Sequence, residues 1–406
     1  MMTVRTVKNP IIPGLGVCDP HIHIFRNRAY LYASHDAKKG SHFYDMYDWQ
    51  IWSSDDLVNW TMESTVRPED FCMGPSFSCW AVDAAEKNDK YYLYVSNGMD
   101  ETYVLISDDP GKGFREPLGR PLLPAGISPT RSYDPAVFTD EDGAAYIVFG
   151  TPVWAGGDSY YIARLNDDMI SLAEEPRKIR LDNPADDKPF IHKHNGMYYL
   201  SWASFYAVSD SICGPYKTMG NLGMSQDHAS FFPWNEQWFM AFTVDETIKK
   251  CSRAAGICYV HFMDDGRMRA DQIIREYGVG QYDGRLNCIE AEWYTRGYHV
   301  DKKENIFDNF DVIMKPGSWI EFPNIHHLPD GAYLIVNAAN DEDTELDVYE
   351  GPEYLGTLHK PQSFQNGGDF SRYGIASVRL PVQGPNHSIR LVSKGNIRLN
   401  WFHFMA

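Results

Sequence analysis

The sequence has few helix signals, because glycine and proline interrupt nearly every window that could form one. It has no CxxC motif, and its 7 cysteines are scattered, which argues against a zinc site of the paired-cysteine type. No apolar run is long enough to span a bilayer. Positive charge is scarce as well: the formal net charge of -18 argues against nucleic acid and acidic membranes as partners.

The N-terminal ten residues lack an apolar core of signal-peptide length. The sequence therefore predicts a cytoplasmic protein with reduced thiols. It carries no indication of an oligomeric state.

Aromatic residues are plentiful instead, with 25 tyrosines and 11 tryptophans among 406 residues. Aromatic side chains favour β-structure, and their flat rings also pack on the apolar faces of sugars. The length allows two domains, and a 43% apolar content is enough for packed cores. Neutral glycans are therefore natural candidate ligands.

A hairpin pattern occurs five times between residues 18 and 242. Each copy has an apolar strand, a polar turn and an aromatic-rich second strand. The turn residues follow one another at intervals of 61, 54, 53 and 40 residues, and they are Asn27, Asn88, Asp142, Asn195 and Asn235. Regular repetition of this kind is typical of the blades of a β-propeller.

Four of the five copies have an aspartate eight residues before the turn. The five residues at this position are Asp19, Trp80, Asp134, Asp187 and Asp227. In a propeller the first strand of each blade lines the central channel, so we expect these residues to meet at one end of it. A single aspartate here would more simply cap a strand or turn, but recurrence at one offset favours a shared site.

The composition changes near residues 275–284, which are polar and rich in glycine. After them the hairpin pattern stops, and short alternating strands continue to the end of the chain. The sequence predicts an all-β protein with a five-bladed β-propeller at 1–275, a linker at 276–287 and a jelly-roll β-sandwich at 288–406.

Several motifs between about residues 10 and 270 resemble those of glycoside hydrolase family 43, a family of five-bladed propellers. They are Cys18-Asp19-Pro20-His21, Ser54 to Trp60, Trp80 to Asp83, Tyr133 to Phe138, and Pro189 to Gly196. Each is weak alone, and together they are specific. The C-terminal part resembles a family 6 carbohydrate-binding module, through its opening Ile289-Glu290-Ala291-Glu292 and its closing Asn400-Trp401-Phe402.

The resemblance implies an inverting hydrolase of α-L-arabinofuranosides or β-D-xylosides that requires no cofactor for its chemistry. By position Asp19 matches the general base, Asp187 the general acid, and Asp134 the residue that orients the acid and tunes its pKa. Inversion needs two carboxyl groups roughly 6.5–9.5 Å apart, with a water molecule beside the base. Ionised Asp134 is expected to keep Asp187 protonated.

Asp187 departs from the family pattern, which usually has glutamate at this position. The missing methylene moves the proton donor, and a misplacement of ~1 Å can cost on the order of 10²-fold in rate. Either the backbone compensates, or turnover is slow, or another group supplies the proton. Glu174, Glu175 and Asp186 are near in sequence but do not share the offset of Asp187.

The resemblance also implies metal ligands. His228 is expected to point into the channel toward a calcium ion or a water molecule, although a lone strand histidine is more often bonded within a core. Glu290 and Glu292 match ligands of a structural calcium in family 6 modules. Asn400 replaces the usual aspartate there and removes one charge, so that site and glycan binding by the tail are both open.

Candidate residues for the sugar pocket come from several blades. Trp80 either packs in the core or forms a platform for the sugar. The predicted substrate-binding residues are Trp80, His21, Trp154, Phe205 and Arg253.

The prediction is a glycosidase that removes terminal arabinofuranosyl or xylosyl groups from small plant-type oligosaccharides. One alternative is a glycan-binding propeller that has lost hydrolysis through the change from glutamate to aspartate. Another is galactosidase specificity on the same scaffold, because a fold does not fix its chemistry. A phosphorylase is disfavoured, because no cluster of arginine and histidine suited to phosphate is evident.

Overall fold

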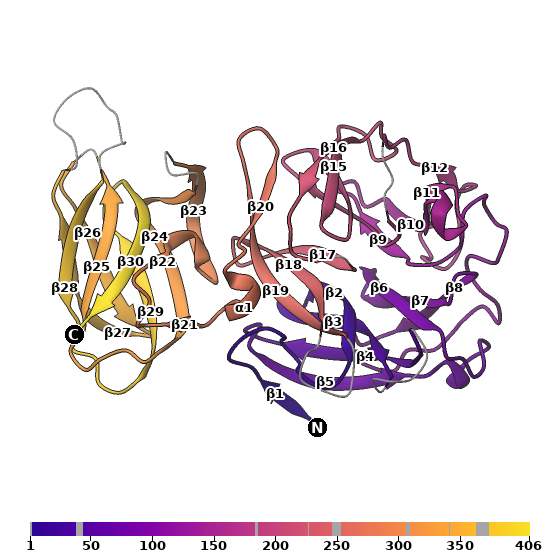
Figure 1. Ribbon diagram of the computed structural model, residues 1–406, viewed down its shortest axis with the longest axis horizontal. Helices are drawn as coiled ribbons and strands as arrows, with labels where there is room; N and C mark the ends of the chain where they lie inside the picture. Colours follow the sequence, from indigo (N-terminus) through magenta and orange to yellow (C-terminus); the bar gives the residue numbers. More distant parts are fainter. Residues whose placement is uncertain are drawn as a thin grey trace. The chain divides into compact units, whose positions relative to one another are not determined.

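The computed structural model describes residues 2–37, 44–182, 186–225, 227–245, 253–305, 309–340, 342–362 and 373–406. Almost all its regular structure is β, as predicted, and Figure 1 shows the order of the elements. The short helices are η1 (Pro68–Asp70), η2 (Val153–Ala155), α1 (Ile274–Tyr277) and η3 (Ala291–Trp293). None of the described helices has the length and apolar character needed to cross a bilayer.

Five antiparallel sheets form the blades of a β-propeller, which confirms the predicted fold (Figure 1). Blade one has the order β1 (Thr3–Arg5), β5 (Asn59–Val66), β4 (Met46–Ser54), β3 (Arg28–Asp36) and β2 (Val17–Phe25). Blade two contains β6 (Cys79–Lys87), β7 (Lys90–Asn97) and β8 (Glu101–Ser107). Blade three contains β9 (Ala136–Thr139), β10 (Ala145–Thr151), β11 (Ser159–Arg164) and β12 (Arg177–Lys178).

The last two blades have four strands each. Blade four contains β13 (Pro189–His194), β14 (Met197–Trp202), β15 (Phe205–Ser209) and β16 (Lys217–Asn221). Blade five contains β17 (Ala229–Trp234), β18 (Gln237–Asp245), β19 (Arg253–Phe262) and β20 (Met268–Ala270). Each blade has one edge strand that faces the centre of the propeller, and these five strands are β2, β6, β9, β13 and β17. The N-terminal β1 is at the opposite edge of blade one.

The five predicted hairpins are the first two of these strands in each blade. Four of them close through two-residue turns in which the asparagine has a positive φ, between 47° and 57°. Asparagine tolerates this left-handed conformation, which matches the twist of paired strands. Blade three is different, because Thr139 pairs with Ala145 across a longer loop.

The predicted position eight residues before each turn is not equivalent in every blade, as the backbone at the channel ends of three innermost strands shows. Asp19 (φ 51°), Asp134 (φ 52°) and Lys188 (φ 68°) each have a left-handed backbone directly before a proline. In blade four this position belongs to Lys188, and Asp187 comes one residue earlier. The offset counted from the turns missed this shift, because the asparagine is the second residue of the turn in blade one and the first in blade four.

Hydroxyl groups of neighbouring blades fix two of these positions. The backbone N–H of Asp19 donates to Oγ1 of Thr243 at 3.1 Å, and that of Asp134 donates to Oγ of Ser96 at 3.1 Å. Both hydroxyls lie on the second strand of the preceding blade. The two aspartates are therefore held in matching environments, because a buried N–H without an acceptor would be costly.

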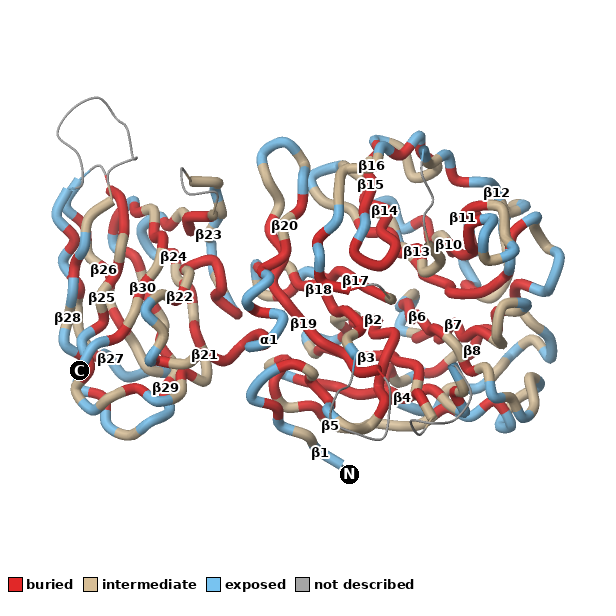
Figure 2. The backbone as a smooth tube through the Cα atoms, in the orientation of Figure 1, coloured by how far each residue is buried: buried red, intermediate tan, exposed pale blue. Residues whose placement is uncertain are grey.

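Aromatic side chains fill the spaces between blades. Trp49 and Tyr32 of blade one pack with Tyr91 of blade two in one buried cluster, and Phe149 of blade three packs with Tyr94 of blade two in another. Buried backbone follows the inner strands in Figure 2. Burial of large rings stabilises the packing of adjacent blades, since each ring removes much apolar area from water.

The C-terminal part forms one ten-stranded sheet that nearly closes on itself, in agreement with the predicted β-sandwich. Its central path runs β27 (Glu353–Lys360), β26 (Thr344–Glu350), β29 (Asn386–Ser393), β24 (Phe310–His326), β30 (Ile397–Met405), β25 (Tyr333–Ala339) and β28 (Gly374–Arg379). The strands β21 (Tyr282–Asp283) and β23 (Arg296–Glu304) pair with β24, and β22 (Ile289–Glu290) pairs with β30.

The chain divides into two compact units. The first comprises Met1–Phe232, Met240–Cys258 and Ala270–Glu276, and the second comprises Pro233–Phe239, Tyr259–Arg269 and Tyr277–Ala406. The linker at 276–287 stays a prediction. The cysteines among the described residues are free thiols.

Candidate active site

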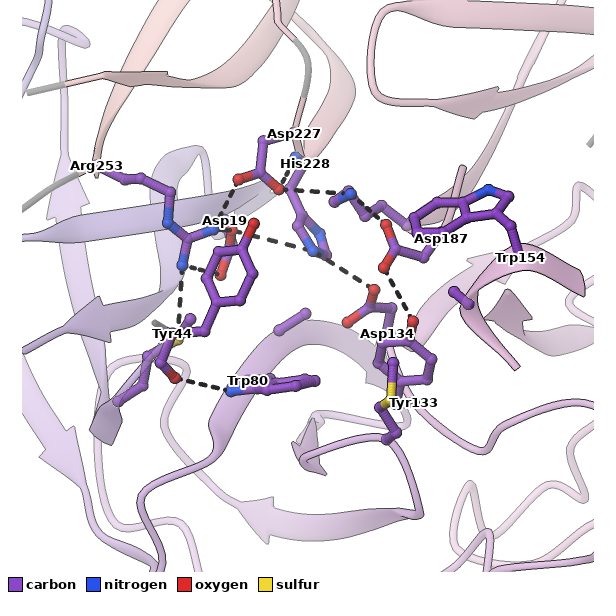
Figure 3. A pocket seen from close by; sticks show the side chains of 15 residues that line it. Asp19, Tyr44, Trp80, Tyr133, Asp134, Trp154, Asp187, Asp227, His228 and Arg253 are labelled. Carbon is purple, nitrogen blue, oxygen red and sulfur yellow. Dashed lines mark hydrogen bonds and ion pairs between the residues drawn. The ribbon is translucent and has the colours of Figure 1, made fainter. Parts of the chain in front are cut away.

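One cavity of about 320 Å³ lies in the propeller at the ends of the innermost strands (Figure 3). Side chains from all five blades, and from the loops that join their strands, contribute to its wall. The lining residues are Asp19, Tyr44, Met46, Trp80, Ala81, Met99, Tyr133, Asp134, Trp154, Ala155, Asp187, Lys188, Asp227, His228 and Arg253. The three predicted catalytic aspartates are therefore brought together, although they are far apart in sequence.

Asp19 forms a buried ion pair with Arg253, whose Nη1 lies 2.7 Å from Oδ1 of Asp19. The same nitrogen lies 2.8 Å from Oδ2 of Asp227, and Nη2 lies 2.7 Å from Oδ1 of Asp36. Burial raises the pKa of Asp19 to about 7; the Arg253 charge opposes this increase, and the Asp227 charge adds to it. The Asp19 carboxyl thus changes its protonation state near neutral pH.

Asp134 faces Asp19 across the ring of His228 (Figure 3). The Nε2 atom of His228 lies 3.7 Å from Oδ2 of Asp134 and 4.0 Å from Oδ1 of Asp19. The two carboxylates therefore lie on either side of one histidine ring. Burial lowers the pKa of His228 to about 3, so the ring is neutral.

Asp187 is held from both sides. Its Oδ1 atom accepts a hydrogen bond from Nζ of Lys188, and its Oδ2 atom accepts one from the Tyr133 hydroxyl at 2.9 Å. Burial alone would raise the pKa of Asp187, but the Lys188 ammonium outweighs it, and the pKa is lowered. In this arrangement Asp187 is therefore an ionised carboxylate.

The charge order of Asp134 and Asp187 is opposite to the prediction. Burial, and then the negative charge of Asp187, raise the pKa of Asp134 well above its usual range. The proton is thus expected on Asp134 and not on Asp187. The prediction was wrong because it did not include Lys188, which stabilises the ionised form of Asp187.

Aromatic rings form two sides of the cavity. Trp80 donates its indole N–H to the Tyr44 carbonyl at 3.0 Å, and its ring centre lies 6.1 Å from that of Tyr133. Trp154 is carried by η2 and is 68% exposed, so its indole remains open to a ligand. These rings suit a sugar, because pyranose and furanose rings have apolar faces.

Two predicted substrate-binding residues do not line this cavity. His21 is buried, with Nδ1 3.0 Å from Oδ1 of Asp83, and Asp83 also lies 2.6 Å from Nε2 of His23. Phe205 stacks on Trp202 with ring centres 6.2 Å apart. His21 therefore belongs to a polar network in the channel, and Phe205 to the aromatic packing of blade four.

The predicted calcium in the channel does not fit the charges of the cavity. Among the described residues, Asp19, Asp227 and His228 could present one ligand atom each within 4.8 Å of one another. Arg253 already binds both carboxylates, at 2.7 and 2.8 Å. A divalent cation between them would lie against the guanidinium, and the two positive charges would repel each other.

The predicted calcium site of the C-terminal unit stays a prediction. Glu292 is fully buried, and Glu290 accepts a hydrogen bond from the Cys288 thiol at 3.4 Å. Asn400 donates through Nδ2 to Asp311 at 3.1 Å, so the residue that replaces the usual aspartate has a carboxylate of its own as partner.

Sequence reasoning missed Lys188, Tyr133 and Tyr44. Lys188 and Tyr133 flank the predicted acids in the sequence, and their positions next to Asp187 and Asp134 were the available signal. Tyr44 lies between β3 and β4 and follows no repeat. Its carbonyl binds Trp80, and its ring lies 5.0 Å from the Arg253 guanidinium carbon.

Comparison with known proteins shows a match to one protein family. Residues 7–267 match the family model described as Glycosyl hydrolases family 43. A xylosidase/arabinosidase of Bacteroides ovatus is 28% identical over 330 residues, which cover 65% of this chain and 98% of the relative. An arabinoxylan arabinofuranohydrolase of Bacillus subtilis (strain 168) is 26% identical over 478 residues, which cover 98% of this chain and 91% of the relative.

Solved structures show the same fold. The GH43_1 enzyme from Xanthomonas citri complexed with xylotriose has a TM-score of 0.56 at 26% identity, covering 64% of this chain and 92% of that chain. A family 43 arabinoxylan arabinofuranohydrolase from Bacillus subtilis in complex with cellotetraose has a TM-score of 0.59 at 22% identity, covering 98% and 97%. The latter likeness extends over both units.

Proposed function

The chain belongs to glycosyl hydrolases family 43, and we propose that it removes terminal α-L-arabinofuranosyl or β-D-xylosyl groups from short oligosaccharides with inversion of the anomeric carbon. The observation that carries this proposal is the meeting of Asp19, Asp134 and Asp187 in one cavity with aromatic walls. Relatives named for xylosidase and arabinosidase activity support the substrate class.

In the proposed reaction, ionised Asp19 takes a proton from a water molecule that attacks the anomeric carbon. The bond from the anomeric carbon to the glycosidic oxygen breaks, and Asp187, which takes up a proton from solvent when the substrate binds, gives that proton to the oxygen. Arg253 orients Asp19 and stabilises its ionised form, because its Nη1 lies 2.7 Å from the carboxylate. The products are a free sugar of inverted configuration and a shortened acceptor.

Asp134 is proposed to act on Asp187 and on the substrate hydroxyls rather than on the attacking water. It lies on the same side of the cavity as Asp187, since Tyr133 directly precedes it and binds the Asp187 carboxylate. A charge on either carboxyl disfavours a charge on the other. The pair therefore shares its protons, and a change at Asp134 is expected to alter the pKa of Asp187.

The size of the cavity supports cleavage at a chain end. Its volume of about 320 Å³ is at the lower limit of the roughly 300–1,000 Å³ typical of ligand pockets. A small sugar unit fits such a space, with Trp80 and Trp154 as walls for its apolar faces. The exposed position of Trp154 suits the sugar that follows the cleaved bond.

A second candidate function is glycan binding without hydrolysis. The pairing of Asp187 with Lys188 favours it, because a carboxylate held ionised cannot give a proton. A panel of nitrophenyl arabinofuranoside, xyloside and galactoside separates the two functions, with Asp19→Asn as the control. Turnover of the first two that Asp19→Asn abolishes supports the proposal, whereas binding without turnover supports the alternative and turnover of the galactoside alone would change the substrate class.

A further inference from the structure

Lys188 has the backbone position in blade four that Asp19 has in blade one and Asp134 in blade three. All three have a left-handed backbone directly before a proline, at the cavity end of an innermost strand. This conformation is rare for residues other than glycine, and before proline it is further restricted. Strain of this kind concentrates at functional sites, so the side chain at this position in blade four is a candidate for a role in the reaction.

The ammonium group of Lys188 lies among three carboxylates. It binds Oδ1 of Asp187, lies 3.2 Å from Oδ1 of Asp186, and lies 3.8 Å from Oδ1 of Asp227. Its side chain is only 14% exposed. Burial would lower the pKa of Lys188, but the charges of Asp187, Asp227 and Asp186 raise it, so the lysine stays charged in the cavity wall.

Both oxygens of the Asp187 carboxylate accept hydrogen bonds, and both bonds favour its ionised form. One carboxylate oxygen accepts from Lys188 and the other from Tyr133. The other titratable or charged groups near Asp187 and Lys188, taken from the described segments around them, are Tyr44, Asp134, Tyr160, Asp186, Asp227, His228 and Arg253. Because the Lys188 ammonium stabilises the negative charge of Asp187, moving it away makes protonation of this carboxyl easier.

Asp227 is a second cavity-lining carboxylate within reach of the ammonium. Its Oδ1 lies 3.8 Å from Nζ of Lys188, while its Oδ2 is bound to Arg253 at 2.8 Å. The nearby guanidinium and ammonium groups overcome the effect of burial and lower the pKa of Asp227 to about 2, so it is ionised at any working pH. A lysine has a flexible stem, and a small rotation would carry its ammonium from one carboxylate to the other.

We propose that Lys188 is a positioning residue for the cleavage: it holds the Asp187 carboxylate before a glycoside binds and transfers its ammonium group to Asp227 when one does. The released carboxylate then takes up a proton from solvent and can donate it to the glycosidic oxygen. This inference rests on the proposed function and explains how an aspartate paired with a lysine can serve as the acid.

The test separates the effect of Asp187 on the pH dependence of the rate from that of Asp19. It compares two substrates that carry the same terminal sugar. A nitrophenyl glycoside has a good leaving group and needs little acid catalysis, whereas the corresponding disaccharide depends on it. The ratio of the two kcat/KM values, disaccharide to nitrophenyl glycoside, therefore follows the protonation of Asp187 in the free enzyme. The same ratio for kcat follows it in the complex. Asp187→Asn is the control that should make both ratios independent of pH.

In Lys188→Met the fall of the kcat/KM ratio with rising pH is expected to move upward by about one pH unit or more, since an opposite charge at this distance lowers a carboxyl pKa by about 1–3 units. The kcat ratio is expected to keep its wild-type profile, because the complex has already lost the contact. Lys188→Arg, which keeps the charge, should retain both wild-type profiles.

An unchanged kcat/KM ratio in Lys188→Met would overturn the proposal. An equal shift in both ratios would overturn the transfer to Asp227, because it would show that the ammonium stays on Asp187 in the complex. Circular dichroism and thermal unfolding establish that the variants fold, and Lys188→Gln replaces Lys188→Met if the latter does not. Absence of turnover of either substrate by the wild type would instead contradict the proposed function itself.

Discussion

Arg253 and Asp19 form a buried ion pair, in which Nη1 of the arginine lies 2.7 Å from Oδ1 of the aspartate. The arginine comes from β19 of blade five and the aspartate from β2 of blade one. The same guanidinium binds Asp36 and Asp227. One side chain therefore compensates the charges of two buried carboxylates and one partly buried carboxylate, and it links the first and last blades.

Replacement of Arg253 by methionine should be strongly destabilising. Loss of one partner of a buried ion pair typically costs about 3–5 kcal/mol, because the remaining charge is uncompensated. Here three carboxylates would lose their cation. Chemical denaturation of Arg253→Met and of the matched Arg253→Lys measures the effect. A loss of free energy of unfolding no larger for methionine than for lysine would contradict this role.

The rate on a nitrophenyl glycoside should increase with pH up to about 7, following the pKa of Asp19 raised by burial. A general base acts only when ionised, so kcat/KM is low below this pKa and constant above it. Asp227→Asn should move this limb to lower pH, because the Asp227 charge adds to the raised pKa of Asp19. The pH profile of kcat/KM for the two proteins checks this, and a limb near pH 4 in the wild type would contradict it.

The raised pKa of Asp19 should also make the free energy of unfolding depend on pH, with a defined sign. The pKa of Asp19 is raised from 3.8 to about 7 on folding, so between these values the folded protein binds more protons than the unfolded one. This contribution is fully present below about pH 4 and is lost as the pH rises through about 7. The free energy of unfolding of the wild type should therefore fall relative to that of Asp19→Asn as the pH rises. Measurement of both proteins from pH 4 to pH 8 tests this. A difference that does not depend on pH would contradict the raised pKa.

Trp80 and Trp154 should bind the sugar, whereas Phe205 should not. Aromatic side chains contribute roughly 0.5–1.5 kcal/mol through ring contacts beyond the area they bury, so Trp80→Ala and Trp154→Ala are expected to raise KM by up to about tenfold. Trp154 is 68% exposed, and its replacement should leave the unfolding temperature near that of the wild type. Phe205→Ala is the control, because it lies outside the cavity lining. An equal rise in KM for all three variants would contradict the assignment of the walls.

Much of the propeller was predictable because its hairpins are local. A turn asparagine and two alternating strands are encoded within about fifteen residues, as at Asn27 and Asn195, and repetition then implies the blades. The repeated offset of Asp19, Asp134 and Asp187 implied their meeting at one end of the channel, and the resemblance to a family supplied their roles. The offset was wrong by one residue in blade four, because Asn195 is the first residue of its turn whereas Asn27 is the second.

The charge state of the site was not predictable in the same way. It depends on Lys188, which faces Asp187 because of a left-handed backbone before Pro189, and on Arg253, which comes from the far end of the propeller sequence. Neither contact follows from spacing or hydrophobic pattern. A pKa depends on burial and on all neighbouring charges at once, so one unrecognised lysine reversed the expected order of two aspartates.

The central claim is that a water molecule activated by Asp19 replaces the glycosidic oxygen from the opposite side of the sugar. Proton NMR of the first product formed from a nitrophenyl β-D-xyloside or α-L-arabinofuranoside tests it directly, before the free sugar equilibrates. The account predicts that the released sugar first appears as the anomer opposite to that of the substrate. First appearance of the same anomer as the substrate would contradict it.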